Sequence, residues 1–288
     1  MPDEEPLTAA IELVSHDVRA DILVAFAEHQ REHPTDQWLR FSELRRRVGH
    51  DDPGNFNYHL QRLVGSLVER SEDGYRLSDV GHRFLAVLHS GRFDPALSRE
   101  FPDLEIACLF CDGAMTVTYA DGLLRTRCPA GHETRLDVGP ELFEEHSIEA
   151  VVNLALCRSL EEGRAFLEGI CPLCDGPTTG GLERVSDGPV PVQYVGQCRR
   201  CGLLLNNTIG GTVLFHPAVV AFAYRRDLDV FREAWTAMTT LVRDTVILAE
   251  DPLRVRIELE RRDDILELVL DETGSVIRVG DGEGGPGR

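Results

Sequence analysis

The stretch CLFCDGAMTVTYADGLLRTRCPAGH, from Cys108 to His132, ends in a histidine where a second Cys-x-x-Cys pair would be expected. A Cys-x-x-Cys pair places two thiolates on one tight turn, at a separation suited to one tetrahedral metal ion. A cysteine and a histidine separated by three residues can close the same tetrahedron, with an imidazole nitrogen in place of one thiolate. We therefore interpret the stretch as a zinc ribbon, and a three-cysteine site completed by water is the alternative. The predicted ligands are Cys108, Cys111, Cys128 and His132.

A second stretch carries the complete two-pair pattern, with CPLC followed after twenty-three residues by CRRC. Two such pairs joined by a strand-forming spacer are typical of a zinc ribbon, and four buried thiols without metal are the alternative. Both stretches open with the motif CxxCDGxxT, repeated at an offset of 63 residues, which indicates two copies of one unit. The predicted ligands of the second ribbon are Cys171, Cys174, Cys198 and Cys201.

Both predicted sites have four protein ligands. Catalytic zinc keeps one coordination position open for water, so closed sites favour a structural role for two zinc ions per chain. We therefore expect that the chain is not an enzyme. A nuclease or another zinc enzyme would require one site to exchange a cysteine ligand for water. The remaining cysteine, Cys157, lies among apolar residues of a predicted helix and is interpreted as a core residue.

Residues 7–90 show the periodicities of four helices, a β-hairpin and a closing helix. The first two helices meet near His16, with Asp17 expected to cap the second helix and Ser42 expected to cap the third. This order of elements predicts a winged helix-turn-helix domain. The expected bounds of the fourth helix, the hairpin and the closing helix are 55–70, 68–78 and 78–91.

Four segments of this region carry a more specific resemblance: ELVSHDVRADILVAF, FSELRRRVG, GNFNYHLQRLVGSLVE and GYRLSDVGHRFL. They resemble ArsR-type winged-helix regulators of archaea. An N-terminal domain of this kind followed by two zinc ribbons resembles haloarchaeal regulator-like proteins. The resemblance is good over residues 7–90 and looser beyond. ArsR-type metalloid sensors often carry cysteine on the helix before the recognition helix. Because FSELRRRVG has none, metalloid sensing at that position is not expected.

The fourth predicted helix corresponds to the recognition helix and has two different faces. Its apolar face holds residues spaced four, three and four apart: Phe56, Leu60, Leu63 and Leu67. His59 borders this face and is expected to pack. The opposite face carries amide and guanidinium groups, which can read base edges in a major groove. Arginines on the preceding helix and around the hairpin are expected to contact phosphate or to lie in solvent. The predicted DNA-binding residues are Arg45, Arg46, Asn55, Asn57, Tyr58, Gln61, Arg62, Arg70 and Arg76.

The charge of the chain is uneven. The net charge is −19, and all thirty basic residues are arginine, a composition similar to that of proteins from salt-loving archaea. Residues 40–83 hold eight arginines against seven acidic residues, a net of +1, whereas residues 84–288 hold twenty against thirty-three, a net of −13. A polyanion could therefore dock on the near-neutral window. Glu72 and Asp73 at the tip of the predicted hairpin are unfavourable near phosphate.

The rest of the chain is predicted to contain helices over 141–168, a helical region after residue 216 and a three-stranded meander. The predicted fold class is α+β and multidomain. It comprises a winged helix-turn-helix, two zinc ribbons joined by helices, and a small C-terminal helix with an antiparallel β-meander. The predicted regions are 1–95 (winged helix-turn-helix), 100–140 (first ribbon), 141–169 (helical connector), 170–211 (second ribbon), 212–280 (C-terminal sensing or interaction region) and 281–288 (disordered tail).

These features favour a transcription regulator that binds double-stranded DNA as a homodimer, with a small effector or a protein partner at its C-terminal region. The alternative is an adaptor of the transcription machinery, similar to archaeal transcription factor E, that acts through protein contacts rather than base readout. We expect a cytoplasmic protein, because the N-terminus has no basic signal region and the run TVLFHPAVVAFAY is too short to span a bilayer. The expected dimer face includes Val80, Phe84, Leu85 and Leu88.

Overall fold

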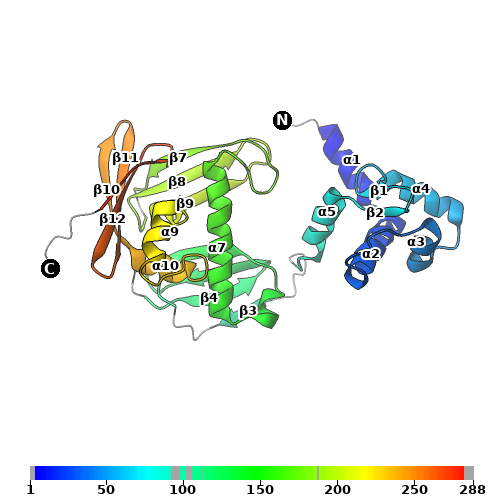
Figure 1. Cartoon of the computed structure of the whole chain (residues 1–288), viewed down its shortest axis with the longest axis horizontal. Coiled ribbons are helices and arrows are strands. Elements are labelled where there is room, and N and C mark those ends of the chain that lie inside the picture. Colours follow the sequence, from blue (N-terminus) through cyan, green and yellow to red (C-terminus); the bar gives the residue numbers. More distant parts are fainter. Residues whose placement is uncertain (1–3, 92–97, 102–105, 112, 187, 282–288) are drawn as a thin grey trace. The chain divides into compact units, whose positions relative to one another are not determined.

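The structure of the chain is a computed structural model that divides into two compact units, Met1–Phe93 and Asp94–Arg288 (Figure 1). Helices and antiparallel sheets occur in both units, which confirms an α+β fold. No helix in the described part of the chain is long and apolar enough to cross a membrane. The structure describes residues 4–91, 98–101, 106–111, 113–186 and 188–281.

The first unit contains four helices, a two-stranded hairpin and a final helix, in the order predicted from the sequence. Its core lies where α2 packs against α3, α4 and α5, and it includes Ile22, Phe26, Leu44 and Phe56. The elements are α1 (Glu4–Val14), α2 (Asp17–Glu32), α3 (Phe41–Val48), α4 (Pro53–Leu63), β1 (Val68–Arg70), β2 (Tyr75–Leu77) and α5 (Asp79–His89).

Two predicted helix caps are wrong. His16, rather than Asp17, caps α2, because its ring nitrogen accepts a hydrogen bond from the N–H of Val18 at 3.3 Å. The cap position of α3 is Arg40, which makes no capping side-chain hydrogen bond, so Ser42 lies inside the first turn. At both places the helix begins one or two residues earlier than a cap preference alone suggests.

The end of α4 also differs from the prediction. The helix stops at Leu63, because Val64 is extended and Gly65 has a φ of 88°, a conformation that favours glycine. Leu67 therefore lies outside the helix, although its side chain is buried in the same core.

The hairpin that follows is antiparallel, with Val68 opposite Leu77 and Arg70 opposite Tyr75. A third short segment joins it, since Leu39 and Tyr75 exchange two backbone hydrogen bonds of 2.9 Å. Gly74 lies against this segment, where an added Cβ would come within 2.3 Å of the carbonyl oxygen of Leu39. The hairpin is thus tied to the chain between α2 and α3.

The second unit contains three antiparallel sheets and five helices within the described residues. The first sheet has the order β3-β4-β5-β6, with β3 (Ser98–Phe101), β4 (Thr116–Ala120), β5 (Leu123–Arg127) and β6 (Glu133–Asp137). The second has the order β7-β8-β9, with β7 (Thr178–Arg184), β8 (Val192–Cys198) and β9 (Leu204–Thr208). The helices are α6 (Leu142–Glu145), α7 (Ile148–Leu167), α8 (Ile209–Val213), α9 (Pro217–Tyr224) and α10 (Ala234–Leu241).

The third sheet has four strands rather than the three predicted. Its order is β10-β11-β12-β13, with β10 (Val242–Glu250), β11 (Leu253–Arg261), β12 (Asp264–Leu270) and β13 (Val276–Asp281). The strand absent from the prediction is β10, which directly follows α10. That helical region is itself broken between α9 and α10, where Asp227 has a φ of 57°. The predicted disordered tail begins within β13, because Asp281 is paired with Leu266, and residues 282–288 lie outside the described residues.

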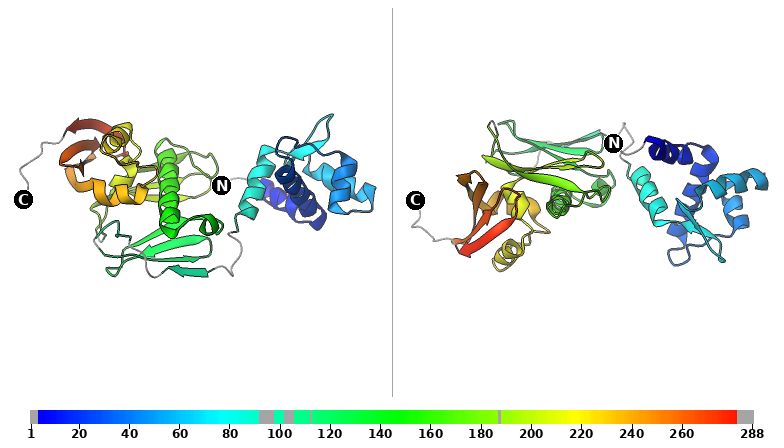
Figure 2. Two further views of the ribbon diagram at one scale, coloured as in Figure 1. Left: turned by 60° about the horizontal axis from the view of Figure 1, so that its bottom comes forward. Right: turned by 90° about the horizontal axis from the view of Figure 1, so that it is seen from above.

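Helix α7 runs alongside the first two sheets and contacts both of them (Figures 1 and 2). Its buried side chains, among them Val152 and Leu156, belong to one core with Leu124 of the first sheet, Tyr194 of the second and Ile257 of the third. The stretches predicted as separate ribbons therefore contribute to a single hydrophobic core.

Candidate metal centres and nucleic-acid interface

The first cysteine cluster is built from two tight turns of the chain. In the first turn, the N–H of Cys108 donates to the carbonyl of Gly113 at 3.0 Å, and in the second the N–H of Cys128 donates to the carbonyl of His132 at 3.1 Å. The turns bring the Nδ1 atom of His132 to 3.6 Å from the sulfur atoms of both Cys108 and Cys128. The sulfur atoms of Cys111 and Cys128 are 3.8 Å apart.

The second cluster repeats this construction. The N–H of Cys171 donates to the carbonyl of Gly176 at 2.9 Å, and the N–H of Cys198 donates to the carbonyl of Leu203 at 2.8 Å. Sulfur–sulfur distances are 3.7 Å from Cys171 to Cys201 and 3.6 Å from Cys174 to Cys198. The hydrogen bond from Cys108 to Gly113 and the one from Cys171 to Gly176 are 63 residues apart, which is the offset of the sequence repeat. The first turn of the two clusters therefore has the same backbone hydrogen bond.

These distances fit tetrahedral coordination. Around an ion about 2.3 Å from sulfur and about 2.05 Å from nitrogen, two sulfur donors lie about 3.8 Å apart and a sulfur and a nitrogen about 3.6 Å apart. Within each cluster, all four donor atoms lie within 4.8 Å of one another. Each of the two predicted ligand sets could therefore bind one metal ion with four protein ligands.

Backbone N–H groups favour the thiolate form that a metal requires. Those of Cys201 and Arg200 point at the sulfur of Cys198 and lower the pKa of that thiol to about 6. Burial opposes ionisation of Cys128, but the N–H groups of His132 and Ala130 lower the pKa of its thiol to about 7.

At Cys174, the crowding of the thiols opposes ionisation. The N–H of Gly176 favours the thiolate of Cys174, yet burial and the three neighbouring thiols raise the pKa of Cys174 to about 12. Four thiols this close cannot all ionise without a cation to balance their charge. A cation bound by the four sulfur atoms would balance this charge, so the second cluster could hold a metal ion only with its thiols ionised.

The surrounding core supports both clusters. The indole N–H of Trp235, on α10, donates to the carbonyl of Ala107 next to the first cluster at 2.8 Å. Phe166 of α7 packs against Cys171 and Cys198. Cys157 is not a ligand and is buried on α7, which confirms its interpretation as a core residue.

The exposed face of α4 carries all five residues predicted on that helix to contact DNA. Phe56, His59, Leu60 and Leu63 are buried, whereas the five predicted residues are exposed: Asn55, Asn57, Tyr58, Gln61 and Arg62. The Gln61 amide nitrogen lies 3.5 Å from the amide oxygen of Asn57 and 3.5 Å from the hydroxyl of Tyr75. The N-cap of the helix is Asp52, whose pKa is lowered by the N–H groups of Asn55 and Gly54.

The four predicted arginines outside α4 have different surroundings. Arg45 donates to the carbonyl oxygens of His50 and Asp51, so it spans the connection between α3 and α4. The side chain of Arg46 is exposed and has no hydrogen bond or ion pair to another described residue. Arg70 lies over the ring of Tyr75, with its guanidinium carbon 5.6 Å from the ring centre. Arg76 pairs with Glu69 at 2.7 Å and lies 4.8 Å over the ring of Trp38.

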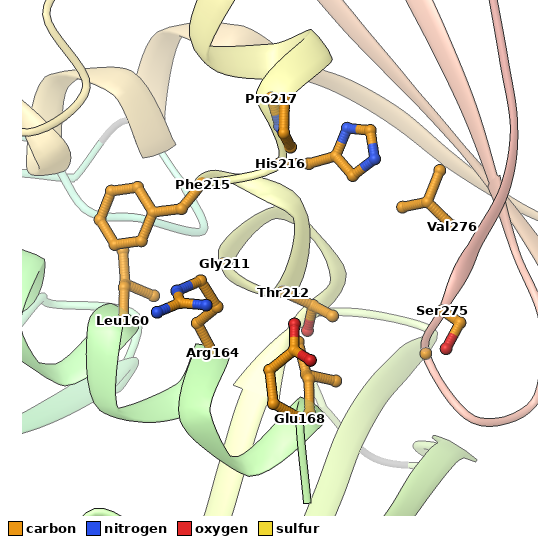
Figure 3. A pocket seen from close by; sticks show the side chains of 12 residues that line it. Leu160, Arg164, Glu168, Gly211, Thr212, Phe215, His216, Pro217, Ser275 and Val276 are labelled. Atoms are coloured by element: carbon orange, nitrogen blue, oxygen red, sulfur yellow. The ribbon is translucent and has the colours of Figure 1, made fainter.

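A cavity of about 550 Å³ in the second unit was not foreseen from the sequence (Figure 3). It lies between α7, the α8–α9 connection and the turn before β13. Its lining includes the apolar Leu160 and Phe215 and the charged Arg164 and Glu168. On the far side from Arg164, His216 caps α9 by accepting from the N–H of Ala218 at 3.2 Å, and burial lowers its pKa.

The fold and the two four-ligand clusters define an α+β protein with two candidate metal centres in its second unit. Residues 105–276, more than half of the chain, match the family described as "Domain of unknown function (DUF7351)", and the chain belongs to this family. Residues 7–88 match a second family, described as "Domain of unknown function (DUF7347)". The two matches fall within the two structural units. No curated protein and no solved structure shows significant similarity to the chain.

Proposed function

We propose that the chain is a sequence-specific DNA-binding transcription regulator whose first unit is a winged helix-turn-helix and whose second unit holds two structural zinc ions. The observation that carries the proposal is the division of α4 into two faces. One face is buried in the core, and the other exposes two asparagines, a tyrosine, a glutamine and an arginine. Amide and guanidinium groups on one exposed helix face can form paired hydrogen bonds with adenine and guanine edges.

The neighbouring elements support this interpretation. Helix α3 precedes α4 through a short turn, and the β1–β2 hairpin follows it, as in winged-helix domains. Four-ligand sites rich in thiolate favour zinc among the common divalent ions, and their closed ligand sets favour a structural role over a catalytic one.

The C-terminal region has one candidate site for an effector, the cavity beside α7. Its volume is within the range of small-molecule sites, and apolar and charged side chains line it together (Figure 3). Arg164 and Glu168 are both exposed at the cavity, and neither has an ion pair with another described residue. A small molecule carrying both an acidic and a basic group would complement them.

The adaptor function remains the second candidate because of the hairpin. Glu72 and Asp73 are exposed at its tip, and both flanking arginines have intramolecular partners. Such a hairpin is a poor phosphate-binding element. In an adaptor, the same hairpin would contact a protein of the transcription machinery.

Gel-shift titration separates the two functions. The full chain is first used to select binding sequences from random duplex DNA, and the selected sequence then competes against scrambled DNA. A regulator shifts the selected duplex. Gln61→Ala should reduce its preference over scrambled DNA by at least about fivefold, because one paired base contact contributes roughly 1–3 kcal/mol of discrimination.

The control is Asn206→Ala, which removes an exposed amide from β9 in the second unit and should leave the preference unchanged. Equal affinity of the wild-type chain for selected and scrambled duplexes would reject base readout and favour the adaptor.

A further inference from the structure

A third group of metal-ligating side chains lies in the first unit, remote in sequence from both cysteine clusters. The last turn of α2 and the residue after it read HQREH, from His29 to His33. Positions 29, 32 and 33 are three and four residues apart, so a helix places their side chains on one side. Two histidines separated in this way are a common metal-binding arrangement.

His29 has an unusual environment within this group. Its side chain is only 4% exposed, and neither ring nitrogen has a hydrogen-bond partner among the described residues. A neutral imidazole carries one N–H donor and one lone pair, and buried polar atoms are almost always paired. A metal ion would satisfy the unpaired nitrogen that carries the lone pair.

The other two side chains complete a ligand set open to solvent. One donor atom each from His29, Glu32 and His33 lies within 4.8 Å of the other two. The Nδ1–H group of His33 donates to the carbonyl of His29 at 3.3 Å, which leaves its Nε2 atom with a lone pair. The His29 and His33 rings are stacked with centres 4.7 Å apart. In stacked rings the nitrogen lone pairs do not converge on one point. Chelation therefore requires the His33 ring to turn, and its side chain is 50% exposed.

We propose that His29, Glu32 and His33 form a third metal site, which takes one exchangeable divalent transition-metal ion. Two imidazoles and one carboxylate suit zinc, nickel, cobalt or copper, whereas magnesium and calcium prefer oxygen ligands throughout. Three protein ligands leave coordination positions for water, so this ion should exchange more readily than an ion held by four cysteines. The proposal does not depend on DNA binding.

The site is coupled to α3 through Glu32. The carboxylate of Glu32 pairs with Arg47 of α3 at 2.9 Å, and Arg47 also lies 3.9 Å from Glu43. A metal ion on Glu32 competes with Arg47 for the same carboxylate. Metal binding therefore loosens a link between α2 and α3, and by reciprocity loss of Arg47 should tighten metal binding.

The test uses the full chain after dialysis against a weak chelator that leaves the four-ligand sites filled. Nickel is then added alone, and equilibrium dialysis with elemental analysis counts bound nickel while checking that zinc is unchanged. The wild-type chain should bind one nickel ion. His29→Gln and His33→Gln should each weaken binding by more than about tenfold.

The matched control is His89→Gln, an exposed histidine on α5, which should bind nickel as the wild type does. Because His29 is buried, circular dichroism must show that its variant folds, and the half-exposed His33 variant decides the question if it does not. Nickel affinity equal to wild type in His33→Gln, or no nickel on the wild-type chain, would overturn the site. Arg47→Gln should bind nickel more tightly, and an unchanged affinity would overturn the assignment of Glu32 as the third ligand.

Discussion

The guanidinium group of Arg45 donates a hydrogen bond to the backbone carbonyl of Asp51 at 2.9 Å. A second, longer bond of 3.3 Å reaches the carbonyl of His50, so one side chain holds the turn that leads into α4. Its neighbour Arg46 points to solvent without such a partner among the described residues. Two adjacent arginines that look equivalent in the sequence therefore have different roles in the structure.

Arg45→Ala and Arg46→Ala should separate these roles. Loss of the Arg45 bonds should lower the free energy of unfolding by about 1–3 kcal/mol, because hydrogen bonds from a charged donor are lost. Arg46→Ala should change stability by less than about 0.5 kcal/mol and weaken binding to DNA of any sequence, with a salt slope lower by about one. Urea denaturation and gel shifts at several salt concentrations measure both quantities. Equal stability of the two variants would contradict the role of Arg45 in the turn.

His59 should make the first unit sensitive to acid. Burial lowers its pKa from the ordinary value of 6.5, and nearby His16, Arg19 and His50 lower it further. Below about pH 6.5 the unfolded chain takes up a proton at this position before the folded chain does. The stability is therefore fully present above that pH and is lost as the pH falls toward the lowered folded pKa.

His59→Gln removes this titration. Urea denaturation at about pH 7 and about pH 5.5 should show a smaller loss of stability on acidification in the variant than in the wild type. His89→Gln is the control, because His89 is an exposed histidine on α5 of the same unit. The idea fails if wild type and His59→Gln lose the same free energy over this interval.

Removal of a metal ligand should unfold the second unit rather than one ribbon alone. The Cys171 side chain is fully buried against Phe166 of α7, and α7 belongs to the core shared by all three sheets. A structural zinc ion contributes about 10–16 kcal/mol of apparent binding free energy, comparable to the stability of a whole domain. Cys171→Ser should therefore lose one of two tightly held ions and the thermal transition of the second unit, while the first unit still melts normally.

Elemental analysis and calorimetry test this expectation. Cys157→Ser is the matched control, since it alters a buried cysteine that lies outside both clusters and should retain both ions. Two tightly held ions in Cys171→Ser would contradict the assignment of the second site. One tightly held ion in the wild type would remove His132 and its three cysteines as a metal centre.

The α5 helix should form the dimer contact. Val80, Val87 and Leu88 are exposed by 62%, 53% and 49%, and they lie on one side of the helix with the partly buried Phe84. Leu85 was expected on this face but is buried in the core of the first unit, so it cannot take part. Val87→Asp should convert a dimer into a monomer, because a carboxylate would be buried at the contact.

Light scattering at micromolar concentration checks the dimer. Ala86→Asp places the same charge on another side of α5 and should leave the dimer intact. A wild-type chain that is monomeric under these conditions would rule the contact out.

The sequence was most informative where the signal is local. Ligand spacing in the two clusters depends on tight turns, so all eight predicted ligands come together in two groups of four.

The limits of α4 were harder to predict. Leu67 continues the helical spacing of Leu63 and is buried, yet the chain has already left the helix at Val64. A buried residue at helical spacing does not prove that the helix continues.

Other features depend on contacts and on burial that the sequence does not indicate. The bonds of Arg45 end on backbone carbonyls, which every residue possesses. Strand β10 escaped prediction because most of its side chains are half-exposed and do not alternate between buried and exposed. The spacing of His29 and His33 was readable in the sequence, but only burial shows that His29 lacks a partner for its ring nitrogens.

The presence of His132 at one corner of the first centre makes the two centres chemically unequal. With one divalent ion in each, four thiolates leave one more negative charge than three thiolates and a neutral imidazole. Peroxides and electrophiles attack thiolate sulfur, and the attack follows exposure. Cys201 is the exposed ligand of the second centre, whereas the corresponding corner of the first centre is an imidazole without sulfur. If each centre holds a metal ion, we expect oxidation to release the ion of the second centre before that of the first.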